Sequence, residues 1–261
     1  MIYYLWVTAS LIHNYRLMKG YGIVSLLLTV FLLSACVDPS SETTKKPFVT
    51  EHNYAEDTKS PSRSVTLPGG NVASDNEDLL EKYRHVWQRP FEVIQQIGDL
   101  KGKTVADIGA GPLGYFSILI AAQNEVDKVI AIDIDQAALD YIEDAKKKWT
   151  DHLEKIETRL ALPDDPRLQE REVDVVLIVN TAIYFKDRIN YFRNLRKGLR
   201  PGGQLVIIDF KKRNTPVGPP AESRISLFDM ERELQEAGYT QIKADDQTLE
   251  YQYIVKAGVP E

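Results

Sequence analysis

The stretch Val105-Ala106-Asp107-Ile108-Gly109-Ala110-Gly111-Pro112-Leu113-Gly114 decides the fold of this 261-residue chain. An apolar run enters it, three glycines follow, and the amphipathic segment YFSILIAA comes next. This order predicts a buried strand, a tight turn and a helix, in which glycines let the backbone approach a ligand closely. Asp133 ends the next predicted strand, 19 residues beyond Gly114 (133 − 114), where a carboxylate can accept hydrogen bonds from a ribose. Together these residues predict a site for a nucleoside-containing cofactor.

The acid ahead of the glycines narrows the choice of cofactor. The spacing G-x-G-x-x-G is shared with dinucleotide-binding folds, where the strand end is usually apolar and packs beneath a pyrophosphate. Asp107 stands two residues before Gly109, and its carboxylate would repel phosphates but accept hydrogen bonds from a cationic amino-acid group. A ligand with a ribose, an ammonium group and no phosphate fits best. S-adenosylmethionine fits that description.

Further segments carry a family resemblance. Over roughly residues 80–261 the chain resembles the class I S-adenosylmethionine-dependent methyltransferases, and within them a bacterial subgroup with WQ-x-P and PVGPP segments. The matching segments are WQRP (87–90), VADIGAG (105–111), AIDID (131–135), DDPRL (164–168), VDVVLIVNT (173–181), LRPGGQLVIIDFKK (199–212), PVGPP (216–220) and YQYIV (251–255). The chain departs from many relatives in two places. Its glycine turn is one residue longer, and Ala182-Ile183-Tyr184 replaces a segment that often carries histidines.

Strand and helix patterns alternate from residue 76 onward, which predicts a doubly wound, Rossmann-like α/β sheet in a single domain. The resemblance implies seven strands, of which the last two form an antiparallel hairpin. The expected strands are 103–108, 129–133, 155–160, 173–179, 204–209, 240–244 and 250–256, and the expected helices are 78–85, 90–98, 113–124, 136–149, 187–198 and 227–237.

Ligands of such sheets bind beyond the carboxyl ends of the strands, so the residues there are the candidates for the cofactor site. The resemblance implies that the glycines wrap the methionine part of the cofactor, that Asp133 holds the ribose hydroxyls and that Leu162 flanks the adenine. Asn180 follows an apolar strand and either reaches the cofactor or caps the next helix. The resemblance also implies that Trp87 and Gln88 cover the cofactor. The alternative for Trp87 is packing in the core. The expected cofactor-binding residues are Asp107, Gly109, Gly111, Gly114, Asp133, Ile134, Leu162 and Asn180.

Methyl transfer from a sulfonium is an in-line displacement that depends mainly on positioning the reactants and excluding water. A catalytic base is therefore not obligatory. Tyr184 and Asp209 are the best-placed catalytic candidates, with a structural or substrate-orienting role as the alternative for each. Arg224 either forms a surface ion pair or binds an anionic substrate.

Charge and composition restrict the partners. The chain carries 32 basic and 38 acidic residues, a net charge of −6, which argues against nucleic acid because phosphate contacts need clustered Lys and Arg. Four scattered histidines and a single cysteine leave no ligand set for a metal such as zinc. A small-molecule methyl acceptor is the expected substrate.

The amino-terminal residues predict export. Arg16 and Lys19 precede an apolar run that ends in Leu-Ser-Ala-Cys, which resembles the bacterial lipobox and predicts lipidation of Cys36. Residues 1–35 are then a signal peptide, with Met18 as an alternative start, residues 36–75 a lipidated flexible tether, and residues 76–261 the methyltransferase domain. Removing the signal leaves a net charge of −8, from 30 basic and 38 acidic residues. The expected location is the bacterial cell envelope, facing the periplasm or on the outer membrane, with a lipid anchor in the membrane.

Two other functions remain open. S-adenosylmethionine is made in the cytoplasm, so a lipoprotein could keep the fold as a binding module without turnover. An NAD-dependent oxidoreductase is disfavoured by Asp107 and by the final hairpin.

Overall fold

The computed structural model describes residues 84–122, 126–148 and 152–260. The predicted signal peptide, the tether and Cys36 lie outside these residues. Within the described ranges, no helix has the length and apolar character needed to cross a membrane.

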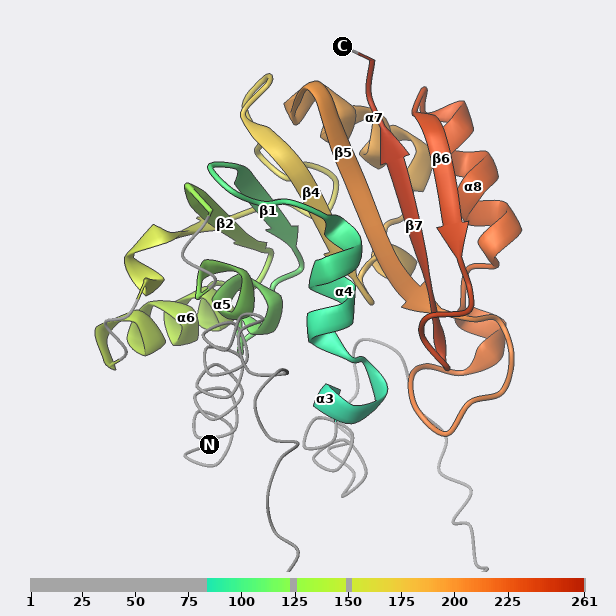
Figure 1. The fold of residues 1–261 in the computed structure, drawn as a ribbon, viewed down its shortest axis with the longest axis horizontal. Coiled ribbons are helices and arrows are strands. Elements are labelled where there is room, and N and C mark those ends of the chain that lie inside the picture. Colours follow the sequence, from blue (N-terminus) through green and yellow to red (C-terminus); the bar gives the residue numbers. More distant parts are fainter. Residues whose placement is uncertain (1–83, 123–125, 149–151, 261) are drawn as a thin grey trace, which may run out of the picture.

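Seven strands form one sheet in the order β3-β2-β1-β4-β5-β7-β6 (Figure 1). Strands β1 to β5 are parallel, whereas β7 runs antiparallel to both β5 and β6. The predicted doubly wound sheet with a final antiparallel hairpin is therefore confirmed. The strands are β1 (Thr104–Ile108), β2 (Lys128–Asp133), β3 (Ile156–Leu160), β4 (Val173–Val179), β5 (Leu199–Phe210), β6 (Thr240–Asp245) and β7 (Gln252–Gly258).

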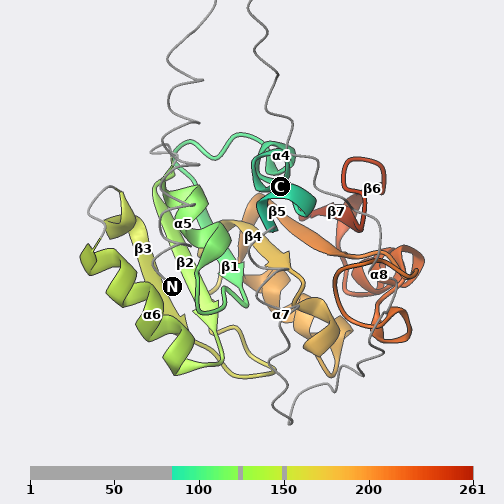
Figure 2. The same cartoon turned by 90° about the horizontal axis from the view of Figure 1, so that it is seen from below.

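Helices cover both faces of the sheet (Figures 1 and 2). Side chains of α4, α5 and α6 form one buried cluster with the sheet, and those of α7 and α8 form a second cluster on the opposite face. Strand β1 is buried along its whole length because it lies between these two layers. The helices are α3 (Arg84–Trp87), α4 (Pro90–Ile97), α5 (Tyr115–Ala121), α6 (Gln136–Lys148), α7 (Arg188–Gly198) and α8 (Leu227–Glu236), with 3-10 turns η1 (Leu153–Lys155), η2 (Ala182–Tyr184) and η3 (Ala221–Ser223).

Strand β5 departs from its predicted bounds. It begins at Leu199, five residues before the predicted 204, and Leu199 pairs with Val173 across a register shift in the ladder. The sequence Pro201-Gly202-Gly203 is typical of a loop, and it forms a bulge within the strand: Val173 pairs with Leu199, Val175 pairs with Gln204, and Gly202 has a φ of 71°. A Cβ added at Gly203 would lie 3.0 Å from the carbonyl oxygen of Asp174 on β4, so the bulge packs closely against the neighbouring strand.

Candidate functional site

The glycine loop joins β1 to α5 and needs glycine at each of its three positions. Gly109, Gly111 and Gly114 have φ angles of 73°, 67° and 51°, in the left-handed region that L side chains rarely adopt. At Gly109 a Cβ would also lie 2.5 Å from side-chain atoms of Thr181, so the end of β4 packs directly on the loop. At Gly111 a Cβ would meet no atom within 4 Å, so this side of the loop is open.

Asp133 ties the end of β2 to this loop. Its Oδ2 accepts a hydrogen bond from the Gly111 amide at 2.8 Å, and its Oδ1 accepts one from the Asp135 amide at 3.0 Å. A carboxylate offers about four acceptor positions, so the side chain can also accept hydrogen bonds from a ligand. The glycine loop and Asp133, which the sequence assigns to one cofactor site, are therefore in direct contact.

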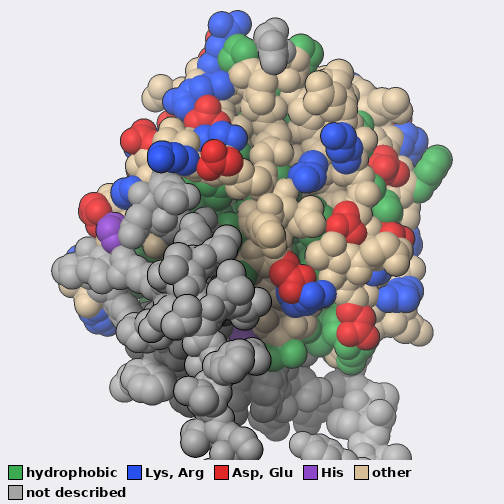
Figure 3. Space-filling model, in the orientation of Figure 1, with side chains coloured by type: hydrophobic (Ala, Val, Ile, Leu, Met, Phe, Trp, Pro, Cys, Tyr) green, Lys and Arg blue, Asp and Glu red, His purple; other side chains and the backbone are tan. Residues whose placement is uncertain are grey.

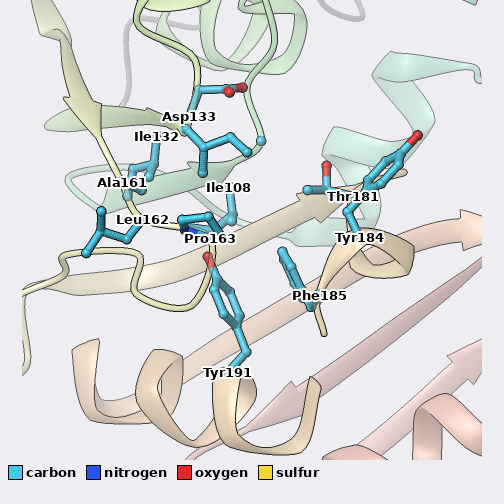
Figure 4. Close-up of a pocket in the computed structure, with 12 residues that line it drawn as sticks. Ile108, Ile132, Asp133, Ala161, Leu162, Pro163, Thr181, Tyr184, Phe185 and Tyr191 are labelled. Carbon is cyan, nitrogen blue, oxygen red and sulfur yellow. The ribbon is translucent and has the colours of Figure 1, made fainter. Parts of the chain in front are cut away.

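A pocket of about 260 Å³ opens beside Asp133 at the carboxyl ends of the parallel strands (Figure 4). Large apolar side chains are exposed around it: Ile134 is 61 % exposed, Leu162 44 % and Tyr184 55 %. Apolar surface left in water is unfavourable unless a partner covers it, and a flat heterocycle would do so. The lining residues are Ile108, Gly109, Ile132, Asp133, Ile134, Ala161, Leu162, Pro163, Thr181, Tyr184, Phe185 and Tyr191.

The predicted cofactor residues divide into two groups. Gly109, Asp133, Ile134 and Leu162 all line the pocket, together with the candidate Tyr184. Gly111 and Gly114 belong to the loop beside it; Gly114 is closed off by Ile142, whose side chain would lie 2.9 Å from an added Cβ.

Asp107 lies elsewhere than expected. It is 3 % exposed, and its Oδ2 accepts a hydrogen bond of 2.7 Å from the Ser117 hydroxyl on α5. Burial raises its pKa to about 6, while Ser117 and Arg84 act in the opposite direction. The reason is strand alternation: Asp107 shares a face with Val105, which packs in the α4–α6 cluster. In this structure Asp107 fastens α5 to β1 and does not line the pocket.

Asn180 also lies outside the pocket lining. It directly follows β4 with a φ angle of 58°, and its Oδ1 accepts a hydrogen bond of 2.5 Å from Gln252 Nε2 on β7. It does not cap the next helical turn, where Thr181 is the N-cap residue and makes no side-chain cap. The WQ-x-P residues belong to the same region: Gln88 is fully buried, and the Trp87 ring centre lies 5.6 Å from that of Phe210.

Asp209 is a buried acid near the end of β5. It is 1 % exposed, its Oδ1 accepts a hydrogen bond from the Phe210 amide, and its Oδ2 has no partner among the described residues. Burial raises its pKa to about 7, against the pull of Arg224 and Arg188. Asp209 is not among the residues that line the pocket, so the two catalytic candidates, Tyr184 and Asp209, occupy separate places.

Arg224 neither forms a surface ion pair nor lies open to a substrate. It is 3 % exposed and donates hydrogen bonds to the carbonyl oxygens of four residues in the segment that follows β5. Its guanidinium also lies 5.1 Å from the centre of the Phe210 ring. Arg224 therefore organises the loop that contains PVGPP. The four acceptors belong to Lys211, Arg213, Val217 and Pro219.

Sequence reasoning missed several lining residues. Thr181 and Phe185 come from the β4–α7 connection, Tyr191 comes from the beginning of α7, and Pro163 comes from the turn after β3. The Phe185 and Tyr191 rings stack with centres 3.9 Å apart and form one wall of the pocket. For Phe185 the only sequence signal was its position shortly after a strand, and for Tyr191 there was none, because aromatic residues in such segments also pack in cores.

Comparisons with known proteins agree with this geometry. Residues 106–207 match the family model described as "Methyltransferase domain". The chain is 25 % identical to phosphoethanolamine N-methyltransferase 1 of Arabidopsis thaliana over 175 residues, which cover 63 % of this chain and 34 % of that protein. The chain thus spans about a third of the length of the curated relatives it matches.

Solved structures agree as well. A SAM-dependent methyltransferase from Aquifex aeolicus superposes with a TM-score of 0.61 at 25 % identity, over 70 % of this chain and 96 % of the other. Phosphoethanolamine N-methyltransferase 2 of Haemonchus contortus, in complex with S-adenosyl-L-methionine, shares the fold at a TM-score of 0.57 and 13 % identity, over 67 % of this chain and 53 % of the other. With the strand order and the glycine loop, these matches support a class I, S-adenosylmethionine-dependent methyltransferase domain, which the family model locates at residues 106–207.

Proposed function

We propose that the chain transfers the methyl group of S-adenosylmethionine to a small-molecule acceptor. One observation carries the proposal: the Asp133 carboxylate, hydrogen-bonded to the glycine loop, stands at a pocket around which Ile134 and Leu162 are exposed. Hydroxyl-binding oxygen atoms beside exposed apolar side chains match a nucleoside, which has a polar ribose and a flat apolar base.

The residues present fit this cofactor. Asp133 would accept the ribose hydroxyls, and Ile134 and Leu162 would lie against the adenine. A pocket of about 260 Å³ falls below the range of roughly 300–1,000 Å³ that holds whole drug-sized ligands, so it suits the nucleoside part alone. The methionine end would continue along the open side of the glycine loop at Gly111.

When bound, the cofactor supplies an electrophilic methyl group on a positively charged sulfur. The chain's own contribution is to position the acceptor in line and to exclude water. Tyr184, half-exposed at the pocket, would orient the acceptor from the β4 side. An amine or hydroxyl acceptor also loses a proton. Asp209 is buried and does not line the pocket, so its carboxyl is not placed to take that proton directly.

A small polar acceptor is consistent with the surface. On the face shown in Figure 3, Lys and Arg side chains are interspersed with Asp and Glu side chains, whereas nucleic-acid binding relies on clustered cations. The two curated relatives are phosphoethanolamine N-methyltransferases, so small amines are the first compounds to test.

Calorimetry and methyl transfer test the proposal. The full-length chain, purified in detergent, is titrated with S-adenosylmethionine, S-adenosylhomocysteine and NAD, and then incubated with methyl-labelled cofactor and envelope extract or small amines. Binding of the first two ligands together with label transfer is expected. Binding of NAD alone would refute the methyltransferase assignment, and cofactor binding without transfer would support the non-catalytic binding module.

We also propose that Cys36 is lipidated and holds the domain at a membrane of the bacterial envelope. The support is the order of basic residues, apolar run and Leu-Ser-Ala-Cys before the tether. Membrane fractionation of a Cys36→Ala variant tests it. The variant should leave the membrane fraction or remain unprocessed, and unchanged lipid attachment would contradict the proposal.

A further inference from the structure

Four side chains from distant parts of the sequence form a continuous hydrogen-bonded chain, called here the amide chain: Arg84, Gln88, Gln252 and Asn180. Arg84 Nε donates to Gln88 Oε1 at 2.5 Å, and Gln88 Nε2 donates to Gln252 Oε1 at 3.3 Å. Gln252 Nε2 then donates to Asn180 Oδ1 at 2.5 Å. The amide chain thus links α3 to the first residue of β7 and to the residue that follows β4 (Figure 1).

The arginine fixes the direction of every amide in this chain. A guanidinium can only donate, so the Gln88 atom that faces it must be the acceptor oxygen. The Gln88 nitrogen then donates to Gln252, and the Gln252 nitrogen in turn donates to Asn180. Turning either glutamine round would place two donors face to face in a buried site, since both glutamines are fully buried.

Asn180 consequently has its oxygen occupied and its nitrogen available. Its Oδ1 is bound to Gln252, and its Nδ2 donates to no described residue. The residue has the left-handed conformation at φ 58°, which breaks the alternation of β4, and its side chain contacts Gln252. Asn180 is thus one residue from Thr181, which packs on Gly109 of the glycine loop. At the other end of the amide chain, the Arg84 guanidinium lies 4.4 Å from the ring centre of Tyr115, the residue that follows Gly114.

A ligand group that meets this amide must accept a hydrogen bond. If the cofactor is S-adenosylmethionine, as proposed above, the nucleoside part occupies the pocket at Asp133 and the methionine end lies along the glycine loop. The methionine end carries an ammonium, which only donates, and a carboxylate, which only accepts. The carboxylate is therefore the group that matches Asn180 Nδ2.

We propose that Asn180 Nδ2 donates a hydrogen bond to the methionine carboxylate of the cofactor, and that Arg84, Gln88 and Gln252 are positioning residues that hold Asn180 in the required orientation. This inference rests on the proposed function. Beyond the proposed function, it assigns Asn180 Nδ2 as the donor and the methionine carboxylate as the acceptor. It also gives Gln88, the glutamine of the WQ-x-P segment, a positioning role.

The sharpest perturbation is Asn180→Asp. Aspartate keeps the oxygen that accepts from Gln252 and replaces only the donor nitrogen with a second, negatively charged oxygen. The variant is titrated by calorimetry, as the full-length chain, with S-adenosylhomocysteine and with 5′-methylthioadenosine. The second ligand has the same nucleoside and thioether sulfur but no carboxylate.

Asn180→Asp should weaken S-adenosylhomocysteine binding by about ten-fold or more, because a charge-assisted hydrogen bond becomes a repulsion. Binding of 5′-methylthioadenosine should stay within about two-fold. Asn194→Asp makes the same chemical change at an exposed position of α7 and should alter neither affinity. Gln252→Glu removes the donor that holds Asn180 Oδ1, so it should produce the same selective loss.

Two outcomes overturn the inference on its own: equal weakening of both ligands in Asn180→Asp, which indicates a general structural role, or no weakening of S-adenosylhomocysteine binding. Because Asn180→Asp is nearly isosteric, the test does not depend on Gln252→Glu folding. If the unmodified chain binds neither ligand, the proposed function fails and the inference fails with it.

Discussion

The glycine loop allows backbone strain to be separated from steric overlap. Gly109 and Gly111 have nearly the same φ, 73° and 67°, so replacing either with alanine incurs a similar conformational cost of about 1–2 kcal/mol. Only at Gly109 does the new methyl group also overlap Thr181, at 2.5 Å, and forcing extra volume into a packed site costs about 1–3 kcal/mol more. We therefore expect Gly109→Ala to lower the free energy of unfolding by about 2–5 kcal/mol and Gly111→Ala by about 1–2 kcal/mol.

Equilibrium unfolding in urea, followed by circular dichroism, measures both values. Repeating the pair in a Thr181→Ala background removes the two atoms that lie 2.5 Å away and should bring the two losses closer together. Cofactor affinity should show the opposite order, because the added methyl of Gly111→Ala enters the open side of the loop. Equal stability losses for the two variants would refute the assignment of Gly109 to close packing against Thr181.

Three further predictions concern single side chains. Asp133→Asn should weaken the binding of both S-adenosylhomocysteine and 5′-methylthioadenosine by about ten-fold or more, as measured by calorimetry. The reason is that an amide side chain cannot accept hydrogen bonds from the Gly111 amide, the Asp135 amide and the ribose together. Weaker binding of S-adenosylhomocysteine alone would contradict this role. Burial raises the pKa of Asp209 from 3.8 to about 7, so the folded chain keeps a proton that the unfolded chain loses between these values. The resulting stability is complete below about pH 4 and is lost as the pH rises through about 7, a fall worth about 4 kcal/mol. Asp209→Asn should flatten this fall in urea titrations across the range, and an unchanged pH profile would count against it. Arg224→Lys keeps the charge but has fewer donors for four buried carbonyl oxygens, so it should lower the free energy of unfolding by about 2–4 kcal/mol, whereas a loss below about 0.5 kcal/mol would show that the loop does not depend on them.

Local features of the site could be predicted from the sequence. The three glycines with positive φ, and an acid at the end of the next strand, follow from rules that act over a few residues. Ile134 directly follows β2, and Leu162, which the family resemblance assigns to the adenine, lies two residues beyond β3; both line the pocket. Such residues reach the carboxyl edge of a parallel sheet whatever the rest of the chain does.

Pairings between distant residues could not be predicted in this way. Gln88 and Gln252 are 164 positions apart, and nothing in either neighbourhood indicates that their amides meet. Asp107 was expected to bind the ligand because it stands near the carboxyl end of a strand. The sequence does not show that its carboxylate instead accepts a hydrogen bond from the buried Ser117. Arg224 looked like a surface residue for the same reason, since its four acceptors are all backbone carbonyl oxygens, which carry no sequence signal.

The position of β7 has a consequence for the order of assembly. Strand β7 follows β6 in the sequence but lies between β5 and β6 in the sheet, and among the described strands β6 pairs with β7 alone. While the chain is being synthesised, β5 therefore has one open edge until β7 arrives, and an unpaired strand edge readily joins other chains. The same strand brings Gln252 to Asn180. A chain that ends within the 246–251 connection would therefore lack Gln252, which holds Asn180, and would also leave the edge of β5 unpaired. One truncation would then impair the proposed ligand recognition and promote aggregation.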